Sequence, residues 1–511
     1  MKSVNYSILI LLFLAISLFS QIYIAPAPDG SDENPGTIEE PYGTFAKAIS
    51  ESAPGDTIYV RGGVYNLTST ITISIVKSGL DSLMCTMTAY RDEQPILDFS
   101  AQSSGSKGIS LKANYWHIIG LQVKGAGDNG MEINFGMNNI IERCQFYENR
   151  DTGLQLSYGS ANNRIINCDS YYNADPTDYG DADGFAPKLT VGSGNYFYGC
   201  RAWGNCDDGW DGYLRGANDV TTTLENCWTW GNGYLKDGTN PGSQANGNGF
   251  KMGGGDNQTV DSLMHHFILI NCVAFDNKGK GFDQNNNLGS MTLYNCTGYN
   301  NIVANYRIQR DLVPGQILTV KNCASYDGAV QLGAFAVQET NSWLDPFEVT
   351  SDDFLSLDSD CADSLRQADG SLPEIDFLHL VEGSDLIDAG VDLGFAYNGD
   401  LPDLGAFESD YTTTTSHTES QIANDFNLFQ NYPNPFNPVT FIGWKLPVNS
   451  HVELNIFNTL GQKVATLVDE FRVTGTYNIK WDASKFSSGI YYYRLSTDTG
   501  YSQTRKMMLI K

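Results

Sequence analysis

The segment "NCDSYYN", residues 167–173, is one copy of a pattern that occurs seven times in the 511-residue chain. An aromatic residue follows each cysteine by three positions, and an asparagine follows it by five in the first six copies. The intervals between the cysteines are 24 to 32 residues, apart from one of 45 residues. A strand-rich unit of that length is typical of one coil of a parallel β-helix. The seven cysteines are Cys144, Cys168, Cys200, Cys227, Cys272, Cys296 and Cys323.

The repeat also predicts which side chains form the interior. Equivalent residues of successive coils stack about 4.8 Å apart, which is one strand spacing. The cysteines should therefore form an inward column of small, reduced side chains, with stacked aromatic rings beside it and an asparagine ladder at a turn. The alternative is disulfide pairing, which ten cysteines in an exported protein would ordinarily suggest.

A second column consists of glycines that are each followed by an apolar residue. If each glycine opens the same strand on its coil, the apolar residue points inward and the residue after it points outward. The residue before each glycine forms a further column, which places Asp183 and Asp208 on adjacent coils. The glycines are Gly130, Gly153, Gly184, Gly209, Gly249 and Gly281. The predicted outward column is Glu132, Gln155, Ala186, Asp211, Lys251 and Asp283.

The stretch "CDDGWDGY", residues 206–213, holds Asp207, Asp208 and Asp211 but no lysine or arginine. The stacked coils bring Asp183 and Lys251 to the same exposed face. Carboxylates this close repel one another unless a proton or a cation intervenes, and Ca²⁺ prefers oxygen ligands of this kind. The pattern predicts a calcium site, either functional or purely structural, since "DADGFA" (181–186) also resembles Asp-rich calcium loops.

Three segments carry a resemblance to a known family: "DADGFAPKLTVGSGNYFYGCRAWGNCDDGWDGY", "NGNGFKMGGG" and "KGFDQNNN". Together they resemble the family-9 polysaccharide lyases over about residues 22–408. The resemblance implies an all-β, right-handed parallel β-helix that cleaves pectate. It also implies that Asp183, Asp207, Asp208 and Asp211 bind the catalytic Ca²⁺, with Lys251 as the base.

The chemistry explains why such residues are needed. Cleavage of a 4-linked uronate by β-elimination removes the C5 proton next to the C6 carboxylate, whose charge a bound Ca²⁺ neutralises. The base must be neutral when it acts, and a cation beside Lys251 disfavours its ammonium form. Lys188 is the second candidate for the base. Candidates for substrate binding are Lys188, Arg201 and Arg215, the two arginines as exposed side chains.

Other functions remain open on the sequence. A rhamnogalacturonan lyase would use the same mechanism, and a non-catalytic glycan-binding surface protein would use the calcium site alone. A polygalacturonase is disfavoured, because such β-helix glycosidases carry a Gly-His-Gly motif and none of the six histidines lies in one.

The charge balance excludes some partners. Lys and Arg total 31 against 59 Asp and Glu, a net charge of -28. That balance argues against nucleic acid and anionic membranes as partners. It leaves an acidic plant cell-wall polysaccharide open, because a bound cation inverts the local field.

The ends of the chain predict export. Residues 1–20 read as a signal peptide, residues 21–410 as the catalytic β-helix and residues 411–423 as a threonine-rich linker. Residues 424–511 read as a small β-sandwich. They resemble a type IX secretion sorting domain, with "YPNPFNP" and a basic final strand. The resemblance implies a protein that is secreted or attached to the cell surface. We expect a monomer.

Overall fold

The computed structural model describes residues 20–255, 262–411 and 427–510, the last range with short gaps at 432–433, 435, 447–449, 460–461, 473–474 and 498–500. The chain divides into two compact units, one of residues 1–391 and 398–412 and one of residues 392–397 and 413–511. The predicted signal peptide and linker lie almost wholly outside the described residues. Among the described residues, none of the helices is both long and apolar enough to span a membrane.

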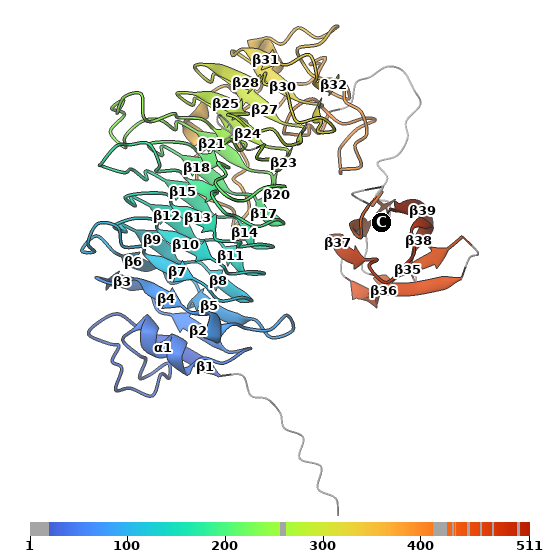
Figure 1. Ribbon diagram of the computed structural model, residues 1–511. Coiled ribbons are helices and arrows are strands. Elements are labelled where there is room, and N and C mark those ends of the chain that lie inside the picture. The colour runs from blue at the N-terminus through green and yellow to red at the C-terminus, as the bar shows by residue number, and fades with distance from the viewer. Residues whose placement is uncertain are drawn as a thin grey trace, which may run out of the picture. The chain divides into compact units, whose positions relative to one another are not determined.

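The first unit is a stack of coils that form three long parallel sheets (Figure 1). A typical coil contributes one strand to each sheet, and each strand pairs with its equivalents on the coils before and after it. The predicted fold class, a right-handed parallel β-helix, is confirmed.

Sheet 1 consists of β1 (Gln21–Ile24), β2 (Thr57–Val60), β5 (Cys85–Ala89), β8 (Trp116–Ile119), β11 (Ile140–Glu142), β14 (Arg164–Ile166), β17 (Asn195–Tyr198), β20 (Val220–Glu225), β23 (His265–Ile270), β26 (Met291–Tyr294), β29 (Leu318–Lys321) and β32 (Val337–Glu339). Sheet 2 consists of β4 (Ile71–Ile73), β7 (Ile109–Leu111), β10 (Met131–Asn134), β13 (Leu154–Ser157), β16 (Phe185–Pro187), β19 (Trp210–Asp211), β22 (Phe250–Lys251), β25 (Lys280–Asp283), β28 (Ala304–Ile308) and β31 (Val330–Leu332). Sheet 3 consists of β3 (Gly63–Asn66), β6 (Pro95–Asp98), β9 (Gln122–Lys124), β12 (Gln145–Tyr147), β15 (Asp169–Tyr171), β18 (Arg201–Trp203), β21 (Trp228–Trp230), β24 (Val273–Phe275), β27 (Thr297–Tyr299) and β30 (Ala324–Tyr326).

The repeated segment of the sequence is the corner between sheets 1 and 3. The residue before each cysteine has a positive φ, for example 52° at Asn167 and 61° at Gly199. This left-handed conformation favours asparagine and glycine. It turns the chain sharply, so the cysteine enters the interior and a three-residue strand of sheet 3 follows. All ten cysteines are free and the seven of the column are buried, which confirms the predicted reduced column.

The asparagine five positions after the cysteine joins one coil to the next. The Nδ2 of Asn173 donates to the Oδ1 of Asn205 at 2.8 Å, and the Nδ2 of Asn205 donates to the Oδ1 of Asn232 at 3.1 Å. Each Oδ1 also accepts the backbone N–H of the preceding asparagine. The predicted ladder is thereby confirmed, and it satisfies buried polar groups that would otherwise lack partners. Its members are Asn149, Asn173, Asn205, Asn232, Asn277 and Asn301, and the last of them donates to Asn305 of β28, which ends the ladder.

The predicted aromatic stack lies on sheet 3. The rings of Tyr171 and Trp203 are 4.4 Å apart, and those of Trp203 and Trp230 are 4.9 Å apart and nearly parallel. The segment after the last coil packs on the outer face of this sheet, where Phe377 contacts Phe275. That segment contains the short 3-10 helices η2 (Ser351–Asp353) and η3 (Ser359–Cys361), and a third, η1 (Ile75–Lys77), lies near the N-terminus.

The N-terminal end of the solenoid core is covered by α1 (Phe45–Glu51). Thr44 caps this helix, because its side chain accepts the N–H of Lys47. Phe45, Ala48 and Ile49 are buried against the core, as predicted for a capping helix.

The second unit contains two antiparallel sheets with their own hydrophobic core, as predicted for a small β-domain. One sheet consists of β33 (Asn427–Leu428), β34 (Val439–Leu446) and β37 (Gly475–Asp482). The other consists of β35 (Ser450–Asn458), β36 (Lys463–Arg472), β38 (Gly489–Thr497) and β39 (Ser502–Leu509).

Removing one rung of the asparagine ladder should destabilise the β-helix. We expect Asn205→Ala to lower the free energy of unfolding by about 2 to 3 kcal/mol, because it leaves the buried backbone N–H of Asn173 without its acceptor and removes one of the donors to the Oδ1 of Asn232. The exposed Asn66 of β3 provides the control, and Asn66→Ala should change stability by less than about 0.5 kcal/mol. Chemical denaturation of both variants measures the difference. Equal stabilities would mean that the ladder does not hold the coils together.

Candidate functional site

The predicted outward column runs along sheet 2. Glu132 pairs with Gln155, Gln155 with Ala186, Asp211 with Lys251, and Lys251 with Asp283 in the register of successive strands. On the inner side of the same strands Phe185, Trp210, Phe250 and Phe282 form a stack of buried rings. The packed interior therefore fixes the positions of the polar side chains on the outer side.

The glycines before these strands permit the coils to approach closely. A Cβ on Gly209 would lie 2.0 Å from the Oγ1 of Thr229 and 2.7 Å from the backbone oxygen of Gly249. A Cβ on Gly184 would lie 2.7 Å from the backbone oxygen of Gly209. Any other residue would separate the coils that carry the carboxylates.

A ladder of side-chain oxygens holds the residues that precede the glycines. The Oδ1 of Asp183 accepts the backbone N–H of Asp208 at 3.2 Å, and the Oδ1 of Asp208 accepts that of Asn248 at 2.7 Å. The Oδ1 of Asn248 in turn accepts the N–H of Lys280 at 3.2 Å. One oxygen of each aspartate is therefore used to position it, while the other oxygen remains for a cation or a lysine.

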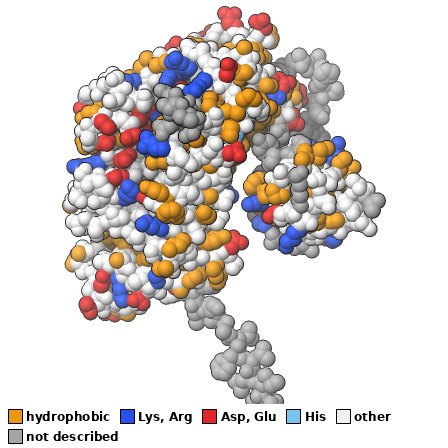
Figure 2. Space-filling view, viewed as in Figure 1, with side chains coloured by type: hydrophobic (Ala, Val, Ile, Leu, Met, Phe, Trp, Pro, Cys, Tyr) orange, Lys and Arg blue, Asp and Glu red, His pale blue; other side chains and the backbone are white. Residues whose placement is uncertain are grey.

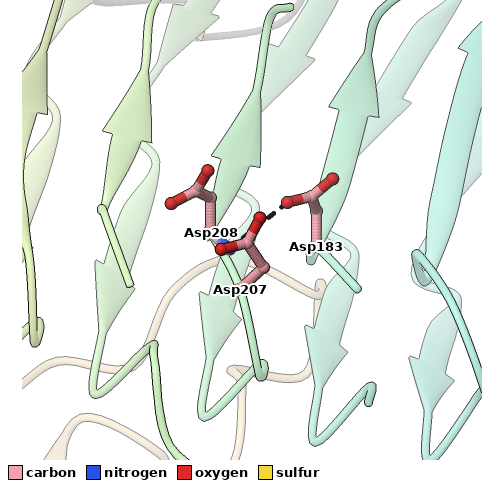
Figure 3. A group of neighbouring side chains, drawn as sticks. All are labelled: Asp183, Asp207 and Asp208. Atoms are coloured by element: carbon pink, nitrogen blue, oxygen red, sulfur yellow. Dashed lines mark hydrogen bonds between the residues drawn. The ribbon is translucent and has the colours of Figure 1, made fainter. Parts of the chain in front are cut away.

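Asp183, Asp207 and Asp208 form a compact group of buried carboxylates (Figure 3). The prediction that they lie on an exposed face is wrong, because at most 1% of each residue is accessible. One oxygen from each lies within 4.8 Å of the others. The Oδ1 of Asp207 accepts the N–H of Asn246, whereas its Oδ2 is buried and accepts no hydrogen bond from the described residues. A buried carboxylate oxygen without a donor fits a cation ligand, and an all-oxygen donor set of this kind suits Ca²⁺.

Asp211 lies between two lysines. Its Oδ1 is 3.3 Å from the Nζ of Lys251, and its Oδ2 is 3.7 Å from the Nζ of Lys188. Lys251 also contacts the Oδ2 of Asp208 at 2.9 Å, and Lys188 contacts the Oδ2 of Asp183 at 2.8 Å. Four carboxylates thus face two ammonium groups, and the fully ionised cluster carries two unbalanced negative charges. A divalent cation would balance them.

The pKa shifts of the four aspartates and Lys251 reflect this excess of negative charge. Burial raises the pKa of Asp183, Asp207 and Asp208, and the neighbouring carboxylates raise it further. Burial opposes ionisation of Asp211 as well, but Lys251 and Lys188 hold its pKa below the ordinary value. Burial by itself would lower the pKa of Lys251, yet Asp208 and Asp211 outweigh it and raise that pKa. Without a cation Lys251 is therefore charged.

Two of the predicted residues lie outside this cluster. The prediction that Arg201 is exposed is wrong, because only 3% of this residue is accessible. Its guanidinium forms two hydrogen bonds of 2.9 Å with Asp169 and donates to the backbone oxygens of Ala362 and Ser364. Arg215 is exposed and lies over the ring of Tyr213, 5.6 Å from its centroid.

The sequence reasoning missed three polar residues that shape the site. Thr152 donates its hydroxyl to the Oδ2 of Asp183 at 3.3 Å, and Asn246 and Asn248 hold Asp207 and Asp208. Thr152 and Asn248 precede glycines in the same column as Asp183 and Asp208, so the repeat itself marks these two positions. Asn246 belongs to the long insertion after β21 (residues 234–247), and no repeat marks it.

The chain is similar to known proteins over both of its units. Residues 22–327 match a family model described as the Pel9A-like, right-handed β-helix region, and residues 430–511 match a secretion system C-terminal sorting domain. The chain is 41% identical over 391 residues to pectate lyase L of Paenibacillus polymyxa, covering 72% of this chain and 83% of that protein. It is 38% identical over 394 residues to pectate lyase L of Dickeya dadantii, covering 75% and 89%.

Solved structures show the same similarity. The crystal structure of the pectate lyase Pel9A covers 76% of this chain and 97% of its own, with 35% identity and a TM-score of 0.69. A rhamnogalacturonan lyase covers 71% of this chain and 96% of its own, with 26% identity and a TM-score of 0.62.

Calcium should stabilise the folded chain, because the cluster exists only in the folded state. We expect Ca²⁺ at 100 times its dissociation constant to add about 2.7 kcal/mol to the free energy of unfolding. Asp207→Asn should abolish most of this gain. In EDTA the same variant should be no less stable than the original chain, because burial already disfavours the charged form of Asp207. Thermal unfolding with Ca²⁺ and with EDTA measures both effects.

The matched control is Asp219→Asn, at an exposed aspartate that pairs with His266. This variant should keep the whole calcium effect. An unchanged gain in Asp207→Asn would contradict the site.

In EDTA, the raised pKa of Asp207 predicts a pH dependence of the free energy of unfolding. The stability contributed by the protonated Asp207 carboxyl is lost as the pH rises above the ordinary carboxyl pKa of 3.8. Asp207→Asn should remove that contribution to the pH dependence.

Proposed function

The chain belongs to the Pel9A-like right-handed β-helix family of polysaccharide lyases, and we propose that it cleaves polygalacturonate by calcium-dependent β-elimination. The pectate lyase relatives support the substrate class. The observation that carries the mechanism is the contact of the Lys251 ammonium with Asp208 and Asp211, at the outer face of sheet 2 and beside a cluster of carboxylates that suits a cation.

We assign the binding of Ca²⁺ to Asp183, Asp207 and Asp208, with Asp211 as a fourth ligand. When bound, the ion would neutralise the uronate carboxylate as a Lewis acid, which makes the C5 proton acidic. It would also offset the carboxylate charges that keep Lys251 protonated in its absence.

Lys251 is the proposed base. Its neutral Nζ takes the C5 proton, the electron pair of the C5–H bond forms the C4–C5 double bond, and the C4–O4 bond breaks. The leaving O4 takes up a proton, so the net reaction transfers one proton from C5 to O4 and consumes no water. Sheet 2 holds the lysine rigidly, because Phe250, one residue before it, is buried between Trp210 and Phe282.

Lys188 is the second candidate for the base, but its contacts favour a positioning role. Its Nζ lies against Asp183 and also approaches the backbone oxygen of Asp181 at 3.4 Å. Its side chain is 6% exposed, against 10% for Lys251. We propose that Lys188 holds Asp183 and Asp211 in place.

A rhamnogalacturonan backbone is the second candidate substrate. The observation that favours it is the solved rhamnogalacturonan lyase, which shares the architecture at 26% identity. The same carboxylates and the same base would serve, because the galacturonate unit carries the acidic proton in both polysaccharides. The non-catalytic glycan-binding alternative gives no catalytic role to Lys251, which lies at the proposed cation cluster of Asp183, Asp207, Asp208 and Asp211.

The C-terminal unit is a secretion system sorting domain, and type IX export follows from it. The protein is therefore exported and is either released or attached to the cell surface. This location gives it access to an external polysaccharide. The proposed signal peptide at residues 1–20 would carry the chain across the inner membrane first.

The first experiment follows the unsaturated product by its ultraviolet absorbance. The full chain is incubated with polygalacturonate in Ca²⁺ or in EDTA, and we expect product only with Ca²⁺. The rate should increase with pH in the alkaline range, because Lys251 must lose its proton. An increase in absorbance with rhamnogalacturonan but not with polygalacturonate would support the mechanism and identify rhamnogalacturonan as the substrate. No product with either substrate would favour the glycan-binding alternative.

Replacing the base should remove turnover and leave the fold intact. We expect Lys251→Ala to lower kcat by about 10³-fold, within the range for loss of a general base, while the stabilisation by Ca²⁺ persists. The control is Lys112→Ala, at a lysine that follows β7 several coils away. Turnover in Lys251→Ala equal to that of the control would overturn the assignment.

A further inference from the structure

A hollow of about 420 Å³ lies beside the cation cluster, within the range of small-ligand sites. The long insertion after β21 forms one wall through Asn240, Gly242, Ser243, Ala245 and Asn246. The start of β25 and the following coil form the other through Lys278, Gly279, Lys280 and Val303. Asn246 lines this hollow and also contacts the cation cluster, because its backbone N–H donates to the Oδ1 of Asp207.

Lys280 places a cation one coil beyond the proposed base. It continues the ladder of Asp183, Asp208 and Asn248, because its N–H is donated to the Oδ1 of Asn248 at 3.2 Å. The residue of β25 that pairs with Lys251 is Asp283, and the Nζ of Lys280 reaches along the strand to the Oδ2 of Asp283 at 3.3 Å. Strands of one sheet are about 4.8 Å apart, so the ammonium of Lys280 lies near the residue one strand spacing from Lys251. A glycan chain that runs along the solenoid axis would pass from one to the other.

The two lysines of the hollow differ in their contacts. The Nζ of Lys278 donates to the backbone oxygens of Gly242 at 2.6 Å and Ala245 at 3.0 Å, so it anchors the insertion. The Nζ of Lys280 makes one hydrogen bond within the described residues, to the Oδ2 of Asp283 at 3.3 Å. Its side chain is 24% exposed. An ammonium group can donate three hydrogen bonds, so Lys280 has donors left for a ligand.

The surroundings favour an anionic ligand with hydroxyl groups. Asn240, Ser243 and Asn246 give the wall polar side chains, and Asp283 holds the lysine in place without enclosing it. On the visible face of the solenoid, basic side chains lie among the acidic ones (Figure 2). A uronate carries both the carboxylate and the hydroxyls that such a wall can bind.

We propose that this hollow is a subsite for the uronate next to the one that loses its proton, and that Lys280 recognises its carboxylate. The proposal rests on the proposed function and deepens it. A polygalacturonate chain has a carboxylate on every unit, so Lys280 always meets one. In a backbone of alternating uronate and neutral sugars, the unit next to the reacting uronate has none. Lys280 therefore selects the continuous polyuronate.

Kinetics of charge-deleted variants test the subsite. Lys280→Met keeps the length of the side chain and removes its charge. We expect it to raise KM for polygalacturonate about tenfold, with kcat changed by less than about twofold and with little change of KM for rhamnogalacturonan. Lys280→Arg should restore most of the affinity, because it keeps the charge. The KM of Lys280→Met should also depend less on NaCl concentration, because one screened attraction is gone.

The matched control is Lys236→Met, at a 60% exposed lysine of the same insertion that pairs with Glu148 and does not line the hollow. The subsite would be overturned if Lys280→Met left KM for polygalacturonate unchanged, or if it raised KM equally for polygalacturonate and rhamnogalacturonan. If the unmodified chain cleaves neither polysaccharide, the proposed function fails, and equilibrium binding of trigalacturonate decides the subsite separately. A tenfold weaker affinity of Lys280→Met than of Lys236→Met would then support it, and equal affinities would overturn it.

Discussion

The hydrogen-bonded register between coils is the constraint on which the rest of this structure depends. Each coil must place its strands directly beside those of the next, so a residue type that recurs in the sequence becomes a column in space. The asparagine ladder, the cysteine column and the stacked rings of Tyr171, Trp203 and Trp230 all follow from this constraint. The cation cluster does as well, because the same register that aligns Gly184 with Gly209 aligns Asp183 with Asp208.

Two buried ionic clusters in the first unit differ in charge balance: the first is neutralised by its own side chains, and the second has an excess of carboxylates. Asp169 lies between Arg201 and Arg366, and despite its burial the guanidinium groups hold its pKa below the ordinary value. That cluster is satisfied internally and ties the segment after the last coil to sheet 3. At the cation cluster four carboxylates share two lysines, and burial raises the pKa of three of them. Such an imbalance costs stability unless a cation binds, and it supports the proposed calcium site.

A chain with a net charge of -28 can act on a polyanion because binding depends on local charges. In the proposed complex, Ca²⁺ and Lys251 face the reacting uronate and Lys280 faces the next one. The insertion after β21 links the two, since Lys278 anchors it from the hollow and Asn246 donates to Asp207. The insertion therefore contributes both to the proposed neighbouring subsite and to the position of Asp207, whereas the proposed base Lys251 lies on β22 of sheet 2.

The sequence alone determined the solenoid and its inward columns, and it brought together Asp183, Asp208, Asp211 and Lys251. It could do so because the strands in contact with one another in a solenoid come from successive repeats, so the repeat pattern directly gives the neighbours. The pattern placed Lys251 beside Asp211, but it did not determine the contacts of Lys188, which belongs to neither column and pairs with Asp183 and Asp211 in the structure. It also misjudged Arg201, whose partners Ala362 and Ser364 lie more than 160 residues further along the chain. The segment that supplies them has no repeat and returns along the outside of the coils, so only the tertiary structure decided that this arginine is structural.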